Sequence, residues 1–189
     1  MAVAGRPRSD ESHKAILQAA YELLAESGFA AFTFERVAAL AGVSRSTIYR
    51  WWPSKGALAM ESTLGALNAA YQPDPAAPAL EQLRTRFHIV ARAFKGPTGR
   101  IVASMLAESQ RDPETLAAFT QNYIEPARAS MRELLRRAIA AGELRADFDI
   151  ELAMDFAFGT LYHQLLLGRS MEPDWIERFA DFLLGASQL

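Results

Sequence analysis

Residues 44–50 form a short run of side chains that can donate and accept hydrogen bonds. The run contains Ser44, Arg45, Ser46, Thr47, Tyr49 and Arg50, and no acidic residue. An arginine can bond both acceptors on the edge of a guanine, and short hydroxyl side chains allow a helix to approach a base or a phosphate closely. These residue types predict noncovalent reading of DNA, with Arg45 as the main candidate for a base contact.

Residues around this run can hold the DNA backbone. Thr33 can offer a phosphate both its hydroxyl and the N-terminus of the helix that follows it. Arg50 can contact a phosphate or form a surface ion pair, and Arg45 can instead be a solvated helix charge. Ser46 and Thr47 can touch a base, a thymine methyl group or a phosphate.

Two short helices separated by a glycine are expected to position this polar face. Thr33 can cap a first helix that runs to about Ala41. After a turn at Gly42, Ser44 can cap a second helix that runs to about Trp52. The positions expected to face inward are Val37, Leu40, Val43, Ile48 and one of the two tryptophans. This spacing is typical of a helix-turn-helix whose second helix enters the major groove. The alternative is a helical hairpin that serves only as core.

The same segment resembles the N-terminal signature of the TetR family of regulators, also called TetR/AcrR. The matching pattern is Ala38-x-x-Ala41-Gly42-Val43-Ser44-x-x-Thr47-Ile48-Tyr49-x-x-Trp52-Pro53-Ser54-Lys55, preceded by Phe29-Ala-Ala-Phe-Thr33. The resemblance covers about residues 10–60. It implies an all-helical homodimer with a DNA-binding head and a ligand-binding body, and it implies that Tyr49 and Lys55 hold phosphates.

The chain departs from the family pattern at Trp51-Trp52, where many members carry a smaller aromatic residue or His followed by Phe. Trp52 is expected in the core, whereas Trp51 lies either against the DNA backbone or over the base of the next helix. The segment Gly5-Arg6-Pro7-Arg8 resembles arms that enter the minor groove of A·T-rich DNA. A tail without a role is the alternative for this segment.

The composition indicates a folded, all-α protein. Half of the 189 residues are apolar, and helical spacing predominates along the chain. Residues 1–60 carry seven Lys or Arg and five Asp or Glu, whereas the remainder carries thirteen and seventeen. This distribution is compatible with a DNA-reading head on an acidic body. Since no apolar run is long enough to span a membrane and no signal peptide is evident, a cytoplasmic location is expected.

The sequence shows no pattern typical of a disulfide, a metal site, a phosphate-binding loop or a catalytic site. The chain has no cysteine, and its three histidines are far apart in sequence, so neither a disulfide nor a metal site is expected. The segment Gly96-Pro-Thr-Gly99 is too short for a phosphate-binding loop and lacks its lysine. No nucleophile has a base at a recognisable spacing. We therefore expect neither an enzyme nor a cofactor.

About nine helices are expected, in three parts. Residues 1–54 form the arm and the helix-turn-helix domain, residues 55–78 a connecting helix and a proline-rich linker, and residues 79–189 a helical domain for effector binding and dimerisation. The first helix is expected to begin near Ser9. A seventh helix should cover about 113–141 with a kink at Pro126, an eighth 149–168, and a ninth about 173–185.

The eighth helix is apolar around most of its circumference, which favours burial on both sides. We expect one side to face the domain core and the other a second subunit, giving a homodimer through the eighth and ninth helices. The alternative is that this helix is simply the centre of a monomer.

A candidate effector pocket is expected among the fourth to eighth helices. Its candidate lining residues are Phe87, His88, Met105, Phe119, Tyr123, Phe156 and Tyr162. This aromatic set suits a mostly apolar ligand, although residues of this kind at helical spacing are more often plain core. His88 and His163 can bond a ligand or be satisfied within the protein.

The predicted function is sequence-specific transcription regulation. The resemblance favours a repressor that leaves an inverted-repeat operator when a small, mostly apolar ligand binds better to another spacing of the two heads. The alternatives are a ligand-dependent activator and a helical small-molecule carrier with a degenerate DNA-binding head.

Overall fold

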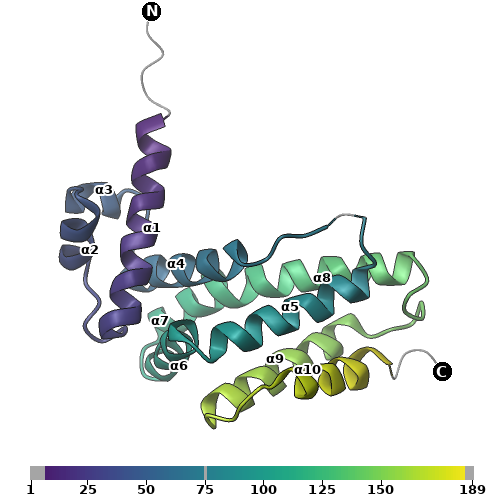
Figure 1. Ribbon diagram of the computed structural model, residues 1–189. Helices are drawn as coiled ribbons and strands as arrows, with labels where there is room; N and C mark the ends of the chain where they lie inside the picture. Colours follow the sequence, from purple (N-terminus) through teal and green to yellow (C-terminus); the bar gives the residue numbers. More distant parts are fainter. Residues whose placement is uncertain (1–6, 75, 186–189) are drawn as a thin grey trace, which may run out of the picture. The chain divides into compact units, whose positions relative to one another are not determined.

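The computed structural model describes residues 7–74 and 76–185, and every regular element in these ranges is helical (Figure 1). The helices are α1 (Pro7–Ser27), α2 (Phe34–Ala41), α3 (Arg45–Tyr49), α4 (Lys55–Ala69), α5 (Ala79–Phe94), α6 (Pro97–Ser109), α7 (Pro113–Phe119), α8 (Glu125–Ala140), α9 (Ile150–Leu166) and α10 (Pro173–Ala180). Two π-helical turns, η1 (Thr120–Ile124) and η2 (Asp181–Gly185), directly follow α7 and α10. In these ranges no helix is long and apolar enough to cross a membrane.

The chain forms two compact units that do not follow chain order. The first comprises residues up to Ala66 together with Arg100–Tyr123, and the second comprises Leu67–Gly99 and the chain from Ile124 onward. The first unit therefore contains the helix-turn-helix segment, most of α6, and α7. An added Cβ on Gly56, in the first turn of α4, would lie 3.5 Å from the Cβ of Ala118 on α7. The start of α4 thus packs directly against α7.

Helix α1 carries the apolar stripe expected from its spacing. Ile16, Ala20, Leu23 and Leu24 are all buried. The helix begins at Pro7, two residues before the predicted start, because a proline fits the first turn, where no intrahelical N–H bond is needed. Gly28 has a φ of 72°, the left-handed conformation that ends a helix.

The predicted seventh helix contains a π-helical turn rather than being one regular α-helix. It runs through α7, η1 and α8, and the widened turn lies just before Pro126. Proline has no N–H for the carbonyl four residues earlier, so the hydrogen-bond ladder is interrupted at this point. The Asn122 side chain donates to the Ala118 carbonyl at 3.0 Å and occupies one acceptor of the preceding turn. Counted this way, the described residues form nine helical rods, as the sequence predicts.

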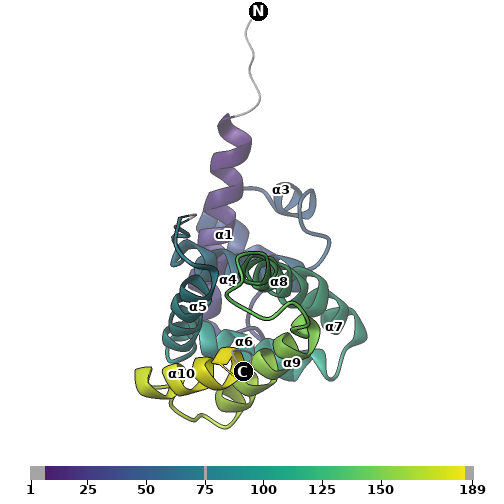
Figure 2. The same ribbon diagram turned by 90° about the vertical axis from the view of Figure 1, so that its right-hand side faces the viewer.

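The second unit is a bundle in which α5 packs on α8 and α10, and α9 packs on α8 and η2 (Figures 1 and 2). Its buried side chains include Leu83, Leu135, Met154 and Ile176. Arg128 and Arg132 of α8 both bond Glu151 at the start of α9, at 3.1 and 2.6 Å. The hydrogen bond from Arg132, assisted by Arg128, lowers the pKa of Glu151 to about 2.

The loop between α8 and α9 caps a helix far away in sequence. Glu143 accepts hydrogen bonds from the backbone N–H groups of Ala79 and Leu80 at 3.0 and 2.9 Å. A carboxylate here satisfies two free donors of α5 and interacts favourably with the positive end of its dipole. The contact fixes α5 relative to the end of α8.

Candidate nucleic-acid interface

The turn between α2 and α3 has the geometry expected from its sequence. The Thr33 hydroxyl accepts a hydrogen bond from the Arg36 N–H at 3.3 Å and caps α2. Gly42 has a φ of 65°, and the Val43 N–H donates to the Ala38 carbonyl at 3.1 Å. This left-handed residue reverses the chain, so only three residues separate the end of α2 from the start of α3.

Helix α3 is a short helix with one apolar and one polar side. Ser44 caps it by accepting from the Thr47 N–H at 3.2 Å, and the Ser44 hydroxyl also lies 2.8 Å from that of Ser46. Ile48 is fully buried, whereas Tyr49 is 51% exposed. The helix ends at Tyr49 rather than near Trp52, and the backbone continues as a turn in which the Trp52 N–H donates to the Ile48 carbonyl.

Arg45 is exposed, and it pairs with an acidic residue on the preceding helix, α2. Its guanidinium lies 3.0 Å from the carboxylate of Glu35 in the first turn of α2. A hydrogen bond with Tyr49 raises the pKa of Arg45, and the charge of Glu35 acts in the same direction. Helix α3 itself contains no acidic residue, but the fold places Glu35 beside its polar face.

Three further residues that are predicted to contact DNA, Tyr49, Arg50 and Lys55, also lie on the first compact unit. The Arg50 guanidinium lies 5.0 Å from the centre of the Trp51 ring, and the Lys55 ammonium lies 4.7 Å from that of Phe29. The Tyr49 ring meets Phe34 edge-on at 4.8 Å. These ring contacts cover one side of each group, and Tyr49, Arg50 and Lys55 are all exposed.

A cluster that the sequence did not predict ties the exit of α3 to α1 and α4. Trp52 is buried, and its indole N–H donates to Glu61 of α4 at 2.6 Å. His13 of α1 stacks on Trp52 at 4.9 Å and lies 3.3 Å from the same carboxylate. Trp51 packs edge-on against both rings. No sequence spacing connects residues 13, 52 and 61, so only the fold brings them together.

Two other predictions for the head concern Leu40 and the N-terminal arm. Leu40 was predicted to face inward, and this is wrong, because its side chain is 54% exposed on α2. In so short a helix, Val37 and Ala38 already supply the buried contact. Of the predicted arm, Gly5 and Arg6 lie outside the described residues, while Pro7 and Arg8 belong to the first turn of α1.

The candidate ligand residues divide between the two units. In the first, Met105 is fully buried, and Phe119 stacks on Tyr123 at 5.4 Å. The members in the second unit are Phe87, His88, Phe156 and Tyr162. The Phe87 ring packs on that of Phe179, and the Tyr162 ring neighbours those of Phe94 and Phe158. His88 lies 2.5 Å from Glu177 of α10, and His163 is exposed.

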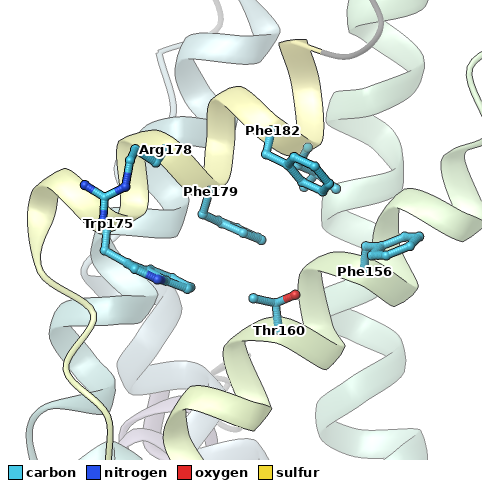
Figure 3. Close-up of a pocket in the computed structure, with 7 residues that line it drawn as sticks. Phe156, Thr160, Trp175, Arg178, Phe179 and Phe182 are labelled. Atoms are coloured by element: carbon cyan, nitrogen blue, oxygen red, sulfur yellow. The ribbon is translucent and has the colours of Figure 1, made fainter.

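Phe156 lies instead in an open apolar groove between α9 and α10 (Figure 3). The remaining labelled residues of this groove are Thr160 from α9, and Trp175, Arg178, Phe179 and Phe182 from α10 and η2. Phe156 is 53% and Phe182 74% exposed. Large aromatic side chains from two helices are thus left uncovered on one face of the second unit.

A capped helix-turn-helix joined to a helical body defines the class of helical DNA-binding regulators, and comparisons with known proteins agree. The family model "Bacterial regulatory proteins, tetR family" matches residues 16–61, and "Tetracyclin repressor-like, C-terminal domain" matches residues 79–183. The chain belongs to the TetR family of transcription regulators, which are not enzymes.

Individual regulators are similar to this protein over most of the chain. It is 34% identical to the uncharacterised HTH-type transcriptional regulator YdeS of Bacillus subtilis, over 86% of this chain and 82% of YdeS. The TetR family regulator SCO0332 has 33% identity and a TM-score of 0.81, covering 93% of this chain and 97% of SCO0332. The Thermus thermophilus transcriptional repressor FadR, solved with lauroyl-CoA, has 25% identity and a TM-score of 0.65, covering 91% and 93%.

The cap geometry predicts the effect of a single hydroxyl. Replacing Ser44 with alanine removes the acceptor for the Thr47 N–H and should lower the free energy of unfolding by about 1 kcal/mol. The matched control is Ser46→Ala, because the only hydrogen-bond partner of the Ser46 hydroxyl in the described structure is Ser44. Chemical denaturation without DNA measures both. Equal stability of the two variants would show that the cap contributes nothing.

Proposed function

We propose that this chain is a homodimeric repressor that binds an inverted-repeat operator and is released by a small, mostly apolar ligand. The observation that carries the DNA-binding half of this proposal is the outer face of α3. Arg45, Ser46 and Tyr49 are exposed there while Ile48 anchors the opposite face. A short helix with this division can enter a major groove without uncovering its core.

Each polar residue has a proposed role in binding. Arg45 bonds the O6 and N7 of a guanine after leaving Glu35, and this exchange costs little because exposed ion pairs contribute little to stability. Thr47 and Ser46 contact a base, a thymine methyl group or a phosphate. The residues proposed to hold phosphates are Thr33, Tyr49, Arg50 and Lys55. Ser44 caps the first turn of α3, and we place it near the DNA backbone.

The proposed ligand binds in the helical body. FadR of Thermus thermophilus, a repressor of the same family, was solved with lauroyl-CoA, and this supports an effector with a large apolar part. The proposed lining residues are Phe87 and Tyr162, which both belong to the second compact unit. We assign His88 to its hydrogen bond with Glu177 rather than to the ligand, since that contact already satisfies its Nε2.

The proposed release mechanism uses helix α4. Residues 55–66 of this helix belong to the first compact unit and Leu67–Ala69 to the second. A ligand that favours one position of α4 over another changes the spacing of the two heads, and it lowers operator affinity by the ratio of its affinities for the two states.

The proposed dimer forms through α9 and α10. The exposed apolar side chains of this region are Leu152, Phe156, Leu166, Leu167 and Phe182, each more than half exposed. Pairing with a second copy would remove them from water and give the two-fold symmetry that an inverted repeat requires. Phe156 is therefore assigned to the subunit interface rather than to the ligand.

One prediction of the proposed function concerns base reading. Arg45→Ala should weaken binding to the duplex selected by the wild-type protein by roughly 5- to 150-fold and relax the sequence preference at one position per half-site. Fluorescence anisotropy at fixed salt measures both effects.

The matched control is Arg145→Ala. Arg145 is similarly exposed, 52% against 55%, and also pairs with a carboxylate, but it lies in the second unit. It should retain wild-type affinity. If Arg45→Ala binds as tightly as Arg145→Ala, Arg45 does not read a base and the assignment of α3 is wrong.

Another prediction of the proposed function concerns the dimer. Phe182→Glu should raise the dimer dissociation constant by roughly tenfold or more, because it loses apolar burial and places a charge in the interface. Sedimentation velocity over a concentration series measures the constant. Leu116→Glu, at a 42% exposed position on α7, is the control and should leave the dimer intact. An unchanged dimer in Phe182→Glu would place the interface elsewhere.

A further inference from the structure

Helix α5 carries basic side chains on two sides, and they have different surroundings. On one side, Arg84 bonds Glu177 and Asp181 at 3.0 and 2.6 Å, and His88 lies beside the same Glu177. On the other side is Arg86. It lies seven, four and three residues after Ala79, Gln82 and Leu83, which are all buried, so it shares their packed face.

Among the described residues, Arg86 has only neutral partners. Its guanidinium donates to the Ser130 hydroxyl of α8 and lies 5.2 Å from the centre of the Tyr71 ring. No acidic side chain within residues 7–74 and 76–185 lies at ion-pair distance from it. Burial lowers the pKa of Arg86. In contrast, Arg84 on the opposite side is paired with two acids.

A partly buried cation without a counter-ion is unfavourable, because desolvation is not offset by a charge of opposite sign. The guanidinium is nevertheless accessible. Within the described part of the chain, no fully buried side-chain nitrogen or oxygen lacks a hydrogen-bond partner. The Arg86 nitrogens that do not bond Ser130 are therefore in contact with solvent, and their N–H groups are available to an acceptor.

The neighbours of Arg86 are themselves held in place. The Tyr71 hydroxyl donates to the Gln82 side-chain carbonyl at 3.0 Å, and the Gln82 amide donates to the Ala77 carbonyl at 2.9 Å. These bonds fix the ring that lies against the guanidinium. The arrangement is a preorganised donor site that lacks only a negative charge.

We propose that Arg86 is the binding site for the anionic group, a carboxylate or a phosphate, of the effector. An anion at this position would neutralise the buried charge and accept the free N–H groups in a charge-assisted contact. This inference rests on the proposed function, in which the helical body binds a ligand, and it specifies that the apolar ligand carries a negative charge near α5 and α8.

The test compares three probes of equal chain length by titration calorimetry on the full-length protein: laurate, lauroyl-CoA and the neutral 1-dodecanol. We expect at least one anionic probe to bind the wild-type protein about tenfold or more tightly than 1-dodecanol does. Arg86→Met should weaken that probe by roughly 30-fold and leave 1-dodecanol unchanged. Binding of laurate indicates a carboxylate as the anion, and binding of lauroyl-CoA alone indicates a phosphate.

Two further variants separate ligand binding from a structural role. Arg84→Met changes the same helix by the same substitution and should leave all three affinities unchanged. Arg86→Lys should retain part of the anion affinity, because it keeps the charge but not the planar donor pair. Without ligand, Arg86→Met should unfold at the same or a higher denaturant concentration than the wild type, because an unpaired buried charge is removed.

The proposal is overturned if neither anionic probe binds the wild type, if 1-dodecanol binds equally well, or if Arg86→Met binds the anion as the wild type does. It is also overturned if Arg86→Met is much less stable without ligand, since Arg86 would then hold α5 to α8. DNA binding is measured separately and without probe. Its absence would contradict the proposed function, whereas its presence with any of these four results would contradict only the role of Arg86.

Discussion

The structure of the head depends on holding a five-residue helix in a fixed position. Isolated helices of this length do not form in water, because nucleation is unfavourable and too few hydrogen bonds follow it. Helix α3 is therefore maintained by its neighbours: the Ser44 cap at its start, Ile48 in the core at its centre, and Trp52 just beyond its end. Since Trp52 bonds Glu61 and stacks on His13, the orientation of α3 is tied to both α1 and α4. Its outer face is thereby left free to carry polar side chains.

The two compact units are joined through helices rather than loops. The chain passes between them three times, within α4, within α6 and at η1. A helix transmits a displacement along its length more directly than a loop does. In the proposed mechanism, a ligand that alters the second unit therefore acts on helices that also belong to the first unit, and α6 and α7 contribute to this coupling as well as α4. The free energy available for release is still limited to the difference in ligand affinity between the two states.

Local sequence patterns predicted most of the fold because their causes are local. The caps at Thr33, Ser44 and Asp149, the left-handed Gly42 and the stripe on α1 each depend on residues within two turns of each other. Pro126 predicted a distortion, although a widened turn before the proline took the place of a simple kink.

The features that sequence reasoning missed depend on residues far apart in the chain. Glu35 beside Arg45, Glu61 between His13 and Trp52, and Glu143 at the start of α5 are all carboxylates whose partners lie on other elements. A single sequence gives no spacing from which such pairs can be inferred. Most candidate DNA-binding residues could be chosen because they lie next to one another on α3 or at its ends, whereas the candidate ligand residues were drawn from five segments and fall in both compact units.

The central claim is that α3 reads DNA sequence in a two-fold symmetric dimer. Selection of random duplexes by the purified protein at near-physiological salt, followed by sequencing, tests this most directly. The account predicts enrichment of an inverted repeat with half-sites about one helical turn apart, or a multiple of it. Selection by an intact dimer that enriches no sequence would contradict the account and favour a helical ligand carrier whose head no longer reads DNA.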